Sequence, residues 1–298
     1  MNNKYNDHLV IVFALEHYNP LGHIRSLGEN GINPVYISVK RGGLSACLSK
    51  YISVCHHVDS VEEGYRLLIS EYGNFGVENK PYVIFSDDRS VGFFDFHYDE
   101  IKDKFIFFNA GKQGRINEFM NKQYILDVAK KHGFHVLDSW VVSKGEIPEN
   151  IQYPVITKDI SPNSGSWKSD VYICENEQEL KDALKKISGS VVQIQKFVNK
   201  KNEYAIEGLT INKGTQMLIG STLRWKYLIK GYYSPYHDVT MMKDADMRSR
   251  LEAMFSEIGF EGIFEVEFLI DQDDTYYFLE INFRASAWNY SSAVAGMP

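Results

Sequence analysis

The chain has 298 residues, which is enough for one to three domains and a large buried core. Its formal net charge is −7, aromatic residues make up 14% of it, and no run of Lys and Arg exceeds two residues, so we expect a globular protein without a nucleic-acid partner. Three cysteines without C-x-x-C spacing predict neither a disulfide framework nor a zinc site, and the lack of a leader-like or membrane-spanning apolar run predicts a cytoplasmic protein with no membrane partner.

The first third of the chain alternates short apolar runs with helix-like segments. The runs that predict strands are 9–15, 35–39, 51–58, 82–85 and 105–108, and the segments that predict helices are 21–29 and 60–72. This alternation is typical of an open parallel α/β sheet, in which ligands bind beyond the carboxyl ends of the strands. Glu16 to Asn19 and Ser86 to Asp88 are therefore candidate ligand positions, although turn and cap chemistry explains them equally well. No G-x-G-x-x-G follows the first strand, so a dinucleotide site is not predicted.

The middle of the chain begins with the clearest helical pattern, from Arg115 to His132, which ends at Gly133. Lys122 lies on it, and a lysine on a helix is usually only solvated. The strands predicted after this helix are 136–142, 154–158, 171–174, 191–198 and 204–211. The small, polar segment 161–169 contains Gly165, and its backbone N–H groups would suit a phosphate, although an exposed hairpin loop is the simpler interpretation.

A basic and aromatic segment follows at 221–236. It carries Arg224, Lys226 and Lys230 in a chain that is acidic overall, which favours a pocket for an anionic substrate. The alternative is a surface loop whose charges extend over aromatic rings. The helix predicted next, at 247–258, has one apolar stripe and is assigned to core packing.

The last strand pair, from Gly262 to Arg284, carries acidic residues among apolar, β-favouring ones. In its first strand one face has Phe264, Val266, Phe268 and Ile270, and the other has Glu265, Glu267 and Leu269. If the connecting loop has an even number of residues centred on Asp273–Asp274, Glu267 lies opposite Glu280, about 5 Å away at Cβ. Mg²⁺ would remove the repulsion between these carboxylates, and Asn282 adds an amide oxygen on the same face. We therefore predict a metal site, the alternative being a solvated strand face.

In this order, the parts of the chain resemble the ATP-grasp superfamily, and within it carboxylate–amine ligases of the D-aspartate ligase-like and carbamoyl-phosphate-synthase-like kinds. The resemblance covers nearly the whole chain, beginning with Asn19–Ile32 and Phe85–Asp88. It implies a fold that is α/β and α+β: an open parallel α/β pre-ATP-grasp domain at 1–114, then an ATP-grasp domain at 115–298. A mobile lid subdomain is implied at about 140–198.

The resemblance also implies roles for individual residues. Lys122 and Lys158 match the two lysines that contact the phosphates of ATP, and Glu203 matches the acid that holds the ribose. Arg284 matches the arginine that meets the reacting carboxylate or the transferred phosphate. The remaining matches are Ser164, Gly165 and Ser166 for the phosphate loop, Gln195, Lys196, Phe197 and Val198 for the adenine hinge, and Glu267, Glu280 and Asn282 for the metal. The family often has Glu where this chain has Gln195.

The implied reaction has two steps. A carboxylate attacks the γ-phosphate of ATP to give an acyl phosphate and ADP, and an amine then displaces phosphate to form an amide. The implied cofactors are ATP and two Mg²⁺ ions, with Mn²⁺ as an alternative, and the implied partners are a small carboxylate and a small amine of the amino-acid class. Arg284 and Lys158 would be catalytic, and Arg224, Lys230 and Arg284 would contact the substrate.

Several alternatives stay open at this point. One is phosphorylation of bicarbonate or carbamate, as in a carbamoyl-phosphate-synthase-like protein, and another is an ATP-binding module without turnover. The sequence does not decide whether the protein is a homodimer. The chain stops sixteen residues after Asn282, whereas many relatives continue, so a truncated chain and a compact member both remain open.

Overall fold

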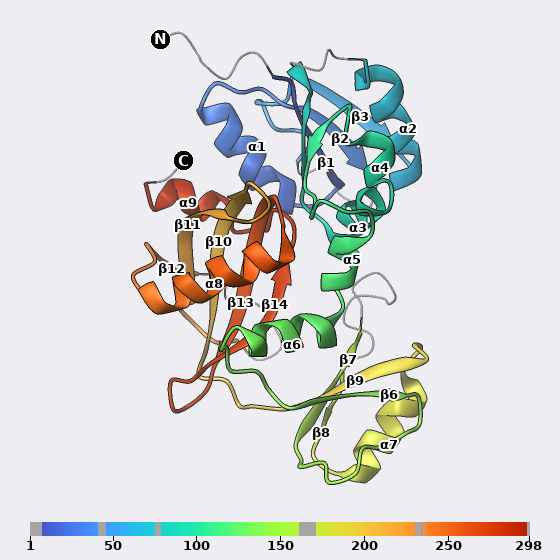
Figure 1. The fold of residues 1–298 in the computed structure, drawn as a ribbon, viewed down its shortest axis with the longest axis vertical. Helices are drawn as coiled ribbons and strands as arrows, with labels where there is room; N and C mark the ends of the chain where they lie inside the picture. Colours follow the sequence, from blue (N-terminus) through green and yellow to red (C-terminus); the bar gives the residue numbers. More distant parts are fainter. Residues whose placement is uncertain are drawn as a thin grey trace.

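The computed structural model describes residues 8–40, 46–74, 79–160, 171–229, 234 and 236–296. Three sheets form its upper, middle and lower parts in Figure 1, and the strands of each sheet come from one consecutive stretch of chain. No helix in the described ranges is long and apolar enough to span a membrane. The predicted class, a parallel α/β sheet followed by antiparallel sheets, is confirmed.

The upper sheet is parallel and has the strand order β3-β2-β1-β4-β5. Its strands are β1 (Val10–Leu15), β2 (Val35–Val39), β3 (Val54–Val58), β4 (Tyr82–Phe85) and β5 (Ile106–Phe107). The accompanying helices are α1 (Asn19–Glu29), α2 (Val61–Tyr72), α3 (Asp88–Phe96) and α4 (Tyr98–Ile101). The strand order reverses at β1 and β4, so the carboxyl ends of these two strands frame the position where such sheets bind ligands.

The predicted helix from Arg115 to His132 is wrong in one respect, because the chain breaks it into α5 (Arg115–Phe119) and α6 (Lys122–Lys131). Asn121 has extended backbone angles, and its side chain accepts hydrogen bonds from the backbone N–H of Gln123 and Tyr124. An asparagine in this role starts a new helix. Lys122 is therefore the first residue of α6, not a position within a longer helix.

The lower sheet is antiparallel and has the order β6-β9-β7-β8. It consists of β6 (Ser139–Ser143), β7 (Val155–Asp159), β8 (Ile173–Cys174) and β9 (Val191–Lys196), and α7 (Glu177–Lys186) packs on it. Val155, Leu180 and Ile194 belong to a hydrophobic cluster that is separate from the main core. The lower part of the molecule, in green and yellow in Figure 1, thus has its own small core.

The middle sheet has the order β12-β11-β10-β13-β14, and its pairs are antiparallel. Its strands are β10 (Asn202–Ile211), β11 (Gln216–Trp225), β12 (His237–Thr240), β13 (Gly262–Ile270) and β14 (Tyr276–Asn282), with helices α8 (Ala245–Ile258) and α9 (Tyr290–Val294). The sequence pattern did not indicate β11, whose carboxyl end falls in the basic and aromatic segment at 221–236. Leu251 and Ile258 of α8 are fully buried, so the predicted core stripe is confirmed.

One hydrophobic core joins the upper and middle sheets. It contains Phe13 and Phe85 from the upper sheet and Phe264 from β13, and the rings of Phe108 and Phe260 meet edge to face, 6.3 Å apart. Alternating apolar residues on β13 supply its middle, since they point away from the acidic face of the same strand. This shared core holds the acidic face of β13 and β14 against the carboxyl ends of β1 and β4.

Phe264→Ala is expected to lower the free energy of unfolding by about 3–5 kcal/mol, because Phe264 is fully buried against Phe255 at a ring distance of 4.2 Å. Urea denaturation followed by circular dichroism would measure the change. Phe96→Ala is the matched control, since Phe96 is 56% exposed and its loss leaves no cavity. Equal effects of the two substitutions would contradict this assignment of the core.

Candidate active site

The hairpin of β13 and β14 brings the predicted metal ligands together. Glu267 lies opposite Glu280, and Glu265 lies opposite Asn282. The expected even-numbered loop is wrong, because Ile270 pairs with Tyr276 and leaves five residues between them. A β-bulge between Glu267 and Phe268 shifts the register by one residue and restores the Glu267–Glu280 pair.

Asn282 holds the carboxylates of this hairpin in place. Its Nδ2 donates to Oε2 of Glu265 at 2.9 Å and to Oε1 of Glu267 at 2.8 Å. Both amide hydrogens are thus directed at carboxylates, which orients the amide oxygen of Asn282 as an additional acceptor. Glu265 and Asn282 are buried, and Glu267 and Glu280 are half-buried.

The electrostatics of the hairpin fit a bound divalent cation. Burial, and then the carboxylates of Glu265, Glu280 and Glu203, raise the pKa of Glu267 well above its usual value. Such a cluster of carboxylates is costly in the deprotonated state unless a cation neutralises it. The donor set is oxygen only, as Mg²⁺ requires. Glu267, Glu280 and Asn282 therefore suit magnesium.

Two lysines belong to this group of charges, Lys158 on β7 of the lower sheet and Lys122 at the start of α6. Burial lowers the pKa of Lys158, and the carboxylates of Glu280, Glu267 and Glu203 oppose this shift while the Lys122 ammonium adds to it. Lys158 therefore lies within electrostatic reach of both the acids and the other lysine. The backbone N–H of Lys122 donates to the carbonyl of Ile160 at 3.1 Å, which ties the start of α6 to the end of β7.

The predicted hinge lies where β9 leaves the lower sheet. Oε1 of buried Gln195 accepts a hydrogen bond from Nζ of Lys158 at 2.8 Å. The backbone N–H groups of Lys196 and Phe197 donate to the carbonyls of Asp138 and Pro154 at 2.8 and 2.9 Å. Lys196 is exposed and Phe197 is half-buried. These two N–H groups are thus occupied, whereas Gln195 has a side-chain role that the sequence did not indicate.

The segment after the hinge carries two further predicted residues, Val198 and Glu203, both half-buried. Glu203 begins the acidic face of β10 and forms an ion pair with Lys200. Burial raises the pKa of Glu203, and the Lys200 ammonium opposes the shift. Its electrostatic interactions with Lys158 and Glu280 place it in the same group of charges.

Arg284 connects the acidic face to the upper sheet. Its Nε lies 3.2 Å from Oδ1 of Asp88, and its Nη1 lies 3.6 Å from Oε2 of Glu265. Burial acts to lower the pKa of Arg284, but these carboxylates, together with Glu267 and Glu280, raise it above its usual value. The backbone N–H of Ala285 donates to the carbonyl of Phe85 at the end of β4, at 2.9 Å.

The candidate ligand positions after β1 and β4 have different outcomes. Asp88 contacts the site by accepting a hydrogen bond from Nε of Arg284. Asp87 has the alternative role of a helix cap, because its carboxylate accepts a hydrogen bond from the backbone N–H of Ser90 in α3. It accepts a second one from the backbone N–H of Leu15. The carboxylate of Glu16 is bound by Tyr36, Ser38 and Ala46.

Two buried acids that the sequence analysis did not assign to the site also belong to it. They are Glu207 and Glu265. They are cross-strand partners on β10 and β13. The carboxylate of Glu207 accepts hydrogen bonds from Ser286 Oγ and from Asn289 Nδ2, the latter at 2.9 Å. The two-residue spacing of Glu203, Ala205 and Glu207 matches the spacing on β13 and would have indicated this second row.

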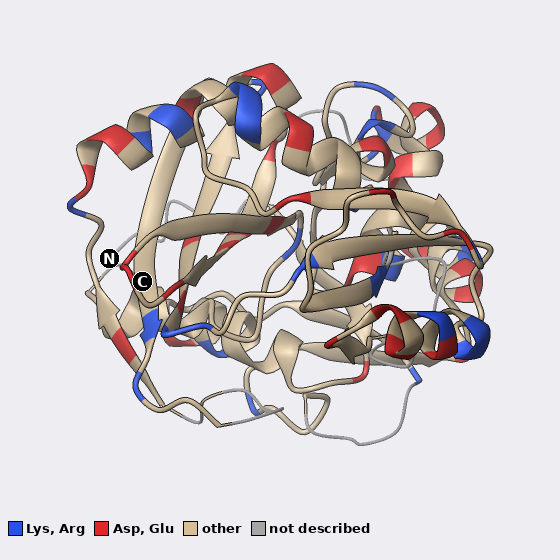
Figure 2. Ribbon diagram, turned by 90° about the horizontal axis from the view of Figure 1, so that it is seen from below, with Lys and Arg blue, Asp and Glu red and all other residues tan. Residues whose placement is uncertain are grey.

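Three of the predicted residues, Ser164, Gly165 and Ser166, lie outside the described residues, as does Lys230. Arg224 is not brought to the acids. It pairs with Tyr204 on the opposite face of the sheet, and its Nη2 lies 3.9 Å from Oδ1 of Asp274 in the β13–β14 loop. Figure 2 shows acidic and basic residues interspersed on the helices of the described part.

Comparisons with known proteins show the family and the fold of this chain. The family model described as carbamoyl-phosphate synthase L chain, ATP binding domain matches residues 118–298, which is more than half of the chain. Among solved structures, the L-amino acid ligase from Bacillus licheniformis has a TM-score of 0.68 at 14% identity, over 97% of this chain and 69% of that one.

Two further solved structures share the fold. N5-carboxyaminoimidazole synthetase from Staphylococcus aureus has a TM-score of 0.65 at 14% identity, over 95% of this chain and 77% of that one. The biotin carboxylase–β-γ-ATP complex from Campylobacter jejuni has a TM-score of 0.67 at 18% identity, over 96% of this chain and 67% of that one.

The second row of acids predicts a pH-dependent stability. Burial raises the pKa of Glu207 from 4.5 to about 7, against the hydrogen bond from Ser286 that lowers it. Between these values the folded protein holds a proton that the unfolded chain has released, so the stability present at low pH is lost as the pH rises. In magnesium-free buffer, this group should lower the free energy of unfolding by about 1–3 kcal/mol from about pH 5 to about pH 8.

Urea denaturation of wild type and Glu207→Gln across that range would measure the effect, since glutamine does not titrate, while its amide oxygen can accept from Asn289 Nδ2 and its amide nitrogen can donate to Ser286 Oγ. The Gln variant should lose this part of the pH dependence. Glu252→Gln is the control and should behave as wild type, because the Glu252 side chain is 44% exposed on α8, where it pairs with Arg248. A Glu207→Gln profile parallel to wild type would refute the assignment.

Proposed function

The chain belongs to the carbamoyl-phosphate synthase L chain ATP-binding family, within the ATP-grasp superfamily of ATP-dependent ligases, and we propose that it activates a carboxylate as an acyl phosphate and joins it to an amine, releasing ADP and phosphate. One observation carries the proposal. Glu267 and Glu280 pair on facing strands, and the same charge cluster includes Lys122, Lys158 and Arg284. Phosphoryl transfer needs mainly alignment and charge neutralisation, and this group of residues supplies both.

Glu267, Glu280 and Asn282 would hold Mg²⁺, and we infer two ions, with Mn²⁺ as a possible replacement. When bound, magnesium neutralises negative charge on the phosphate oxygens. Asn282 orients the carboxylate of Glu267 for this role through its 2.8 Å hydrogen bond. Glu265 lies behind them and is held by the same amide at 2.9 Å.

Lys122 and Lys158 would place positive charge over the phosphates of ATP. Gln195 orients Lys158 by accepting a hydrogen bond from its ammonium. Because the N–H groups of Lys196 and Phe197 are occupied, an adenine ring would be recognised through the carbonyls of the hinge and the backbone of Val198. Glu203 would accept hydrogen bonds from the ribose hydroxyls.

Arg284 would grip the carboxylate substrate or the transferred phosphate, since a guanidinium binds either group through two parallel hydrogen bonds. Asp88 and Glu265 fix its orientation from two sides. Arg224, which faces away from the acids, has less support as a substrate contact, and Lys230 remains a prediction.

We infer that the chain has a pre-ATP-grasp domain at 1–114 and an ATP-grasp domain at 115–298. Within the second domain, residues of about 140–198 would form a lid that closes over the nucleotide. The separate hydrophobic cluster of the lower sheet supports this division, because a unit with its own core can move as a body. Closure would exclude water from the acyl phosphate, and the phosphate loop is assigned to Ser164, Gly165 and Ser166.

The substrates proposed are a small carboxylate and a small amine, with amino acids as the first class to test. The L-amino acid ligase among the similar folds supports that choice. A second candidate is phosphorylation of bicarbonate or carbamate, which the description of the family favours. The acidic row, the lysines and Arg284 would serve either reaction, so the acceptor decides between them.

Glu280→Gln should reduce substrate-stimulated ADP release by about 100-fold or more, because it removes a carboxylate needed to hold the cation on the phosphates. A coupled ADP assay with mixed amino acids, and separately with bicarbonate, would measure the rate. Asp273→Asn, in the exposed β13–β14 loop, is the control and should be unchanged. Equal ADP release by wild type and Glu280→Gln would overturn the metal assignment, and nucleotide binding without any turnover would favour a non-catalytic module.

Asp88→Asn should lower kcat/KM for the carboxylate substrate by about tenfold, while KM for ATP changes little, because Asp88 acts by orienting Arg284. Steady-state kinetics with each substrate varied in turn would show the split. Asp99→Asn, on exposed α4, is the control. A rise in KM for ATP alone would place Asp88 outside the carboxylate subsite.

A further inference from the structure

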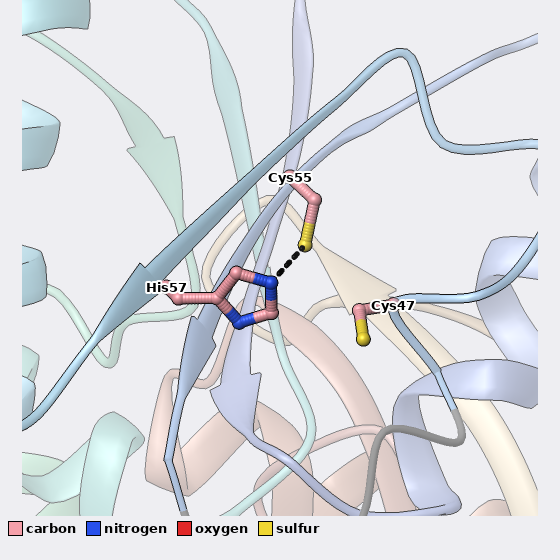
Figure 3. Close-up of side chains that lie close together, drawn as sticks. All are labelled: Cys47, Cys55 and His57. Atoms are coloured by element: carbon pink, nitrogen blue, oxygen red, sulfur yellow. Dashed lines mark hydrogen bonds between the residues drawn. The ribbon is translucent and has the colours of Figure 1, made fainter.

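The sequence predicted no zinc site, yet the fold brings two cysteines and a histidine together at the edge of the upper sheet. Cys55 and His57 are two residues apart on edge strand β3, so both side chains point to one face. Cys47 comes to the same face from the segment after β2. Figure 3 shows the two thiols and the imidazole converging from these elements.

The distances suit a tetrahedral cation. One ligand atom from each of Cys47, Cys55 and His57 lies within 4.8 Å of the others, and Sγ of Cys55 is 3.7 Å from Nε2 of His57. With Zn–S near 2.3 Å and Zn–N near 2.0 Å, neighbouring ligand atoms in a tetrahedral zinc site are about 3.6 Å apart. Small side-chain rotations would therefore complete the arrangement.

A buried carboxylate supports the cluster from behind. Glu16, which is 5% exposed, accepts hydrogen bonds from the Tyr36 hydroxyl at 2.9 Å, the Ser38 hydroxyl at 2.7 Å and the backbone N–H of Ala46 at 3.0 Å. The bond to Ala46 fixes the backbone next to Cys47. The Glu16 carboxylate also raises the pKa of both thiols, so it lies within electrostatic range of the cluster.

The environment of the two thiols argues against a redox or nucleophilic role, and it means that a bound cation must displace their protons. Burial, the Cys47 thiol and the Glu16 carboxylate raise the pKa of Cys55 to about 11, and burial and Glu16 also raise the pKa of Cys47. Reactive cysteines have a lowered pKa and electropositive neighbours, which these lack among the groups acting on them. A cation displaces the thiol protons directly, and exposed His57 leaves it a path from solvent.

We propose that Cys47, Cys55 and His57 bind a thiophilic divalent cation of the Zn²⁺ class, with solvent at the fourth position. The cation would join the segment after β2 to edge strand β3, whose outer side has no neighbouring strand in the described sheet. This site is distinct from the acidic hairpin, which offers oxygen donors only, so it does not depend on the proposed ligase activity.

The test uses the whole reduced protein with excess Mg²⁺ to occupy the oxygen site. Titration with Co²⁺ should give one equivalent with thiolate-to-cobalt charge-transfer absorption, and competition with Zn²⁺ should abolish that absorption. Cys47→Ser, Cys55→Ser and His57→Ala should each weaken binding by about tenfold or more. Circular dichroism would verify that each variant is folded.

Two matched controls isolate the cluster. His56→Ala removes the neighbouring histidine, which points to the other face of β3 and bonds Tyr72 at 2.7 Å, and Cys174→Ser removes the buried cysteine of the lower sheet. Both should bind as wild type. The proposal would be overturned if the wild-type protein bound Co²⁺ without the thiolate charge-transfer band, or if Cys55→Ser bound Co²⁺ as tightly as wild type. It would also be overturned if Cys47 and Cys55 formed a disulfide and its reduction restored no Co²⁺ binding.

Discussion

The close approach of two carboxylates on facing strands is the constraint on which the rest of the site depends. Glu267 and Glu280 are held opposite each other by a β-bulge, and Glu203 and Glu265 add further negative charge. Such a concentration of acids persists in a folded protein only when protons or cations compensate it. Lys122, Lys158 and Arg284 supply the fixed positive charge, and in the proposed function a divalent cation and the triphosphate of ATP bind between the two sets.

The compensating positive charges come from different elements of the molecule. Lys158 belongs to the lower sheet, Lys122 begins the helix beside it, and Arg284 follows the acidic hairpin and reaches Asp88 at the end of β4. The upper and middle parts are joined by one apolar core, whereas the lower part has its own. Lys158 thus belongs to the part with a separate core, whereas Lys122 begins α6, whose Ile125 and Leu126 belong to the same core as the acidic hairpin.

The sequence predicted the features that follow from short-range periodicity. The alternation along β13 predicted which residues lie on its acidic face and which apolar residues lie in the core. It failed where a single side chain or a distant contact decides. Asn121 interrupts a helical pattern by capping a new helix, and Arg224, predicted to contact the substrate, lies on the face of β11 that points away from the acids. The Cys47, Cys55 and His57 cluster depends on how the segment after β2 returns to the sheet, which residue spacing does not encode.

The aromatic contact between Phe108 and Phe260 has a consequence for how the chain can be divided. Both rings are almost entirely buried, and a Cβ added at Gly262 would come within 2.7 Å of Phe108, so the two surfaces fit closely. Cutting the chain near residue 114 would expose this phenylalanine-rich surface on both fragments and promote their aggregation. The upper sheet is thus not expected to be stable when it is separated from the rest of the chain. The two fragments should be soluble only when they are co-expressed and reassemble.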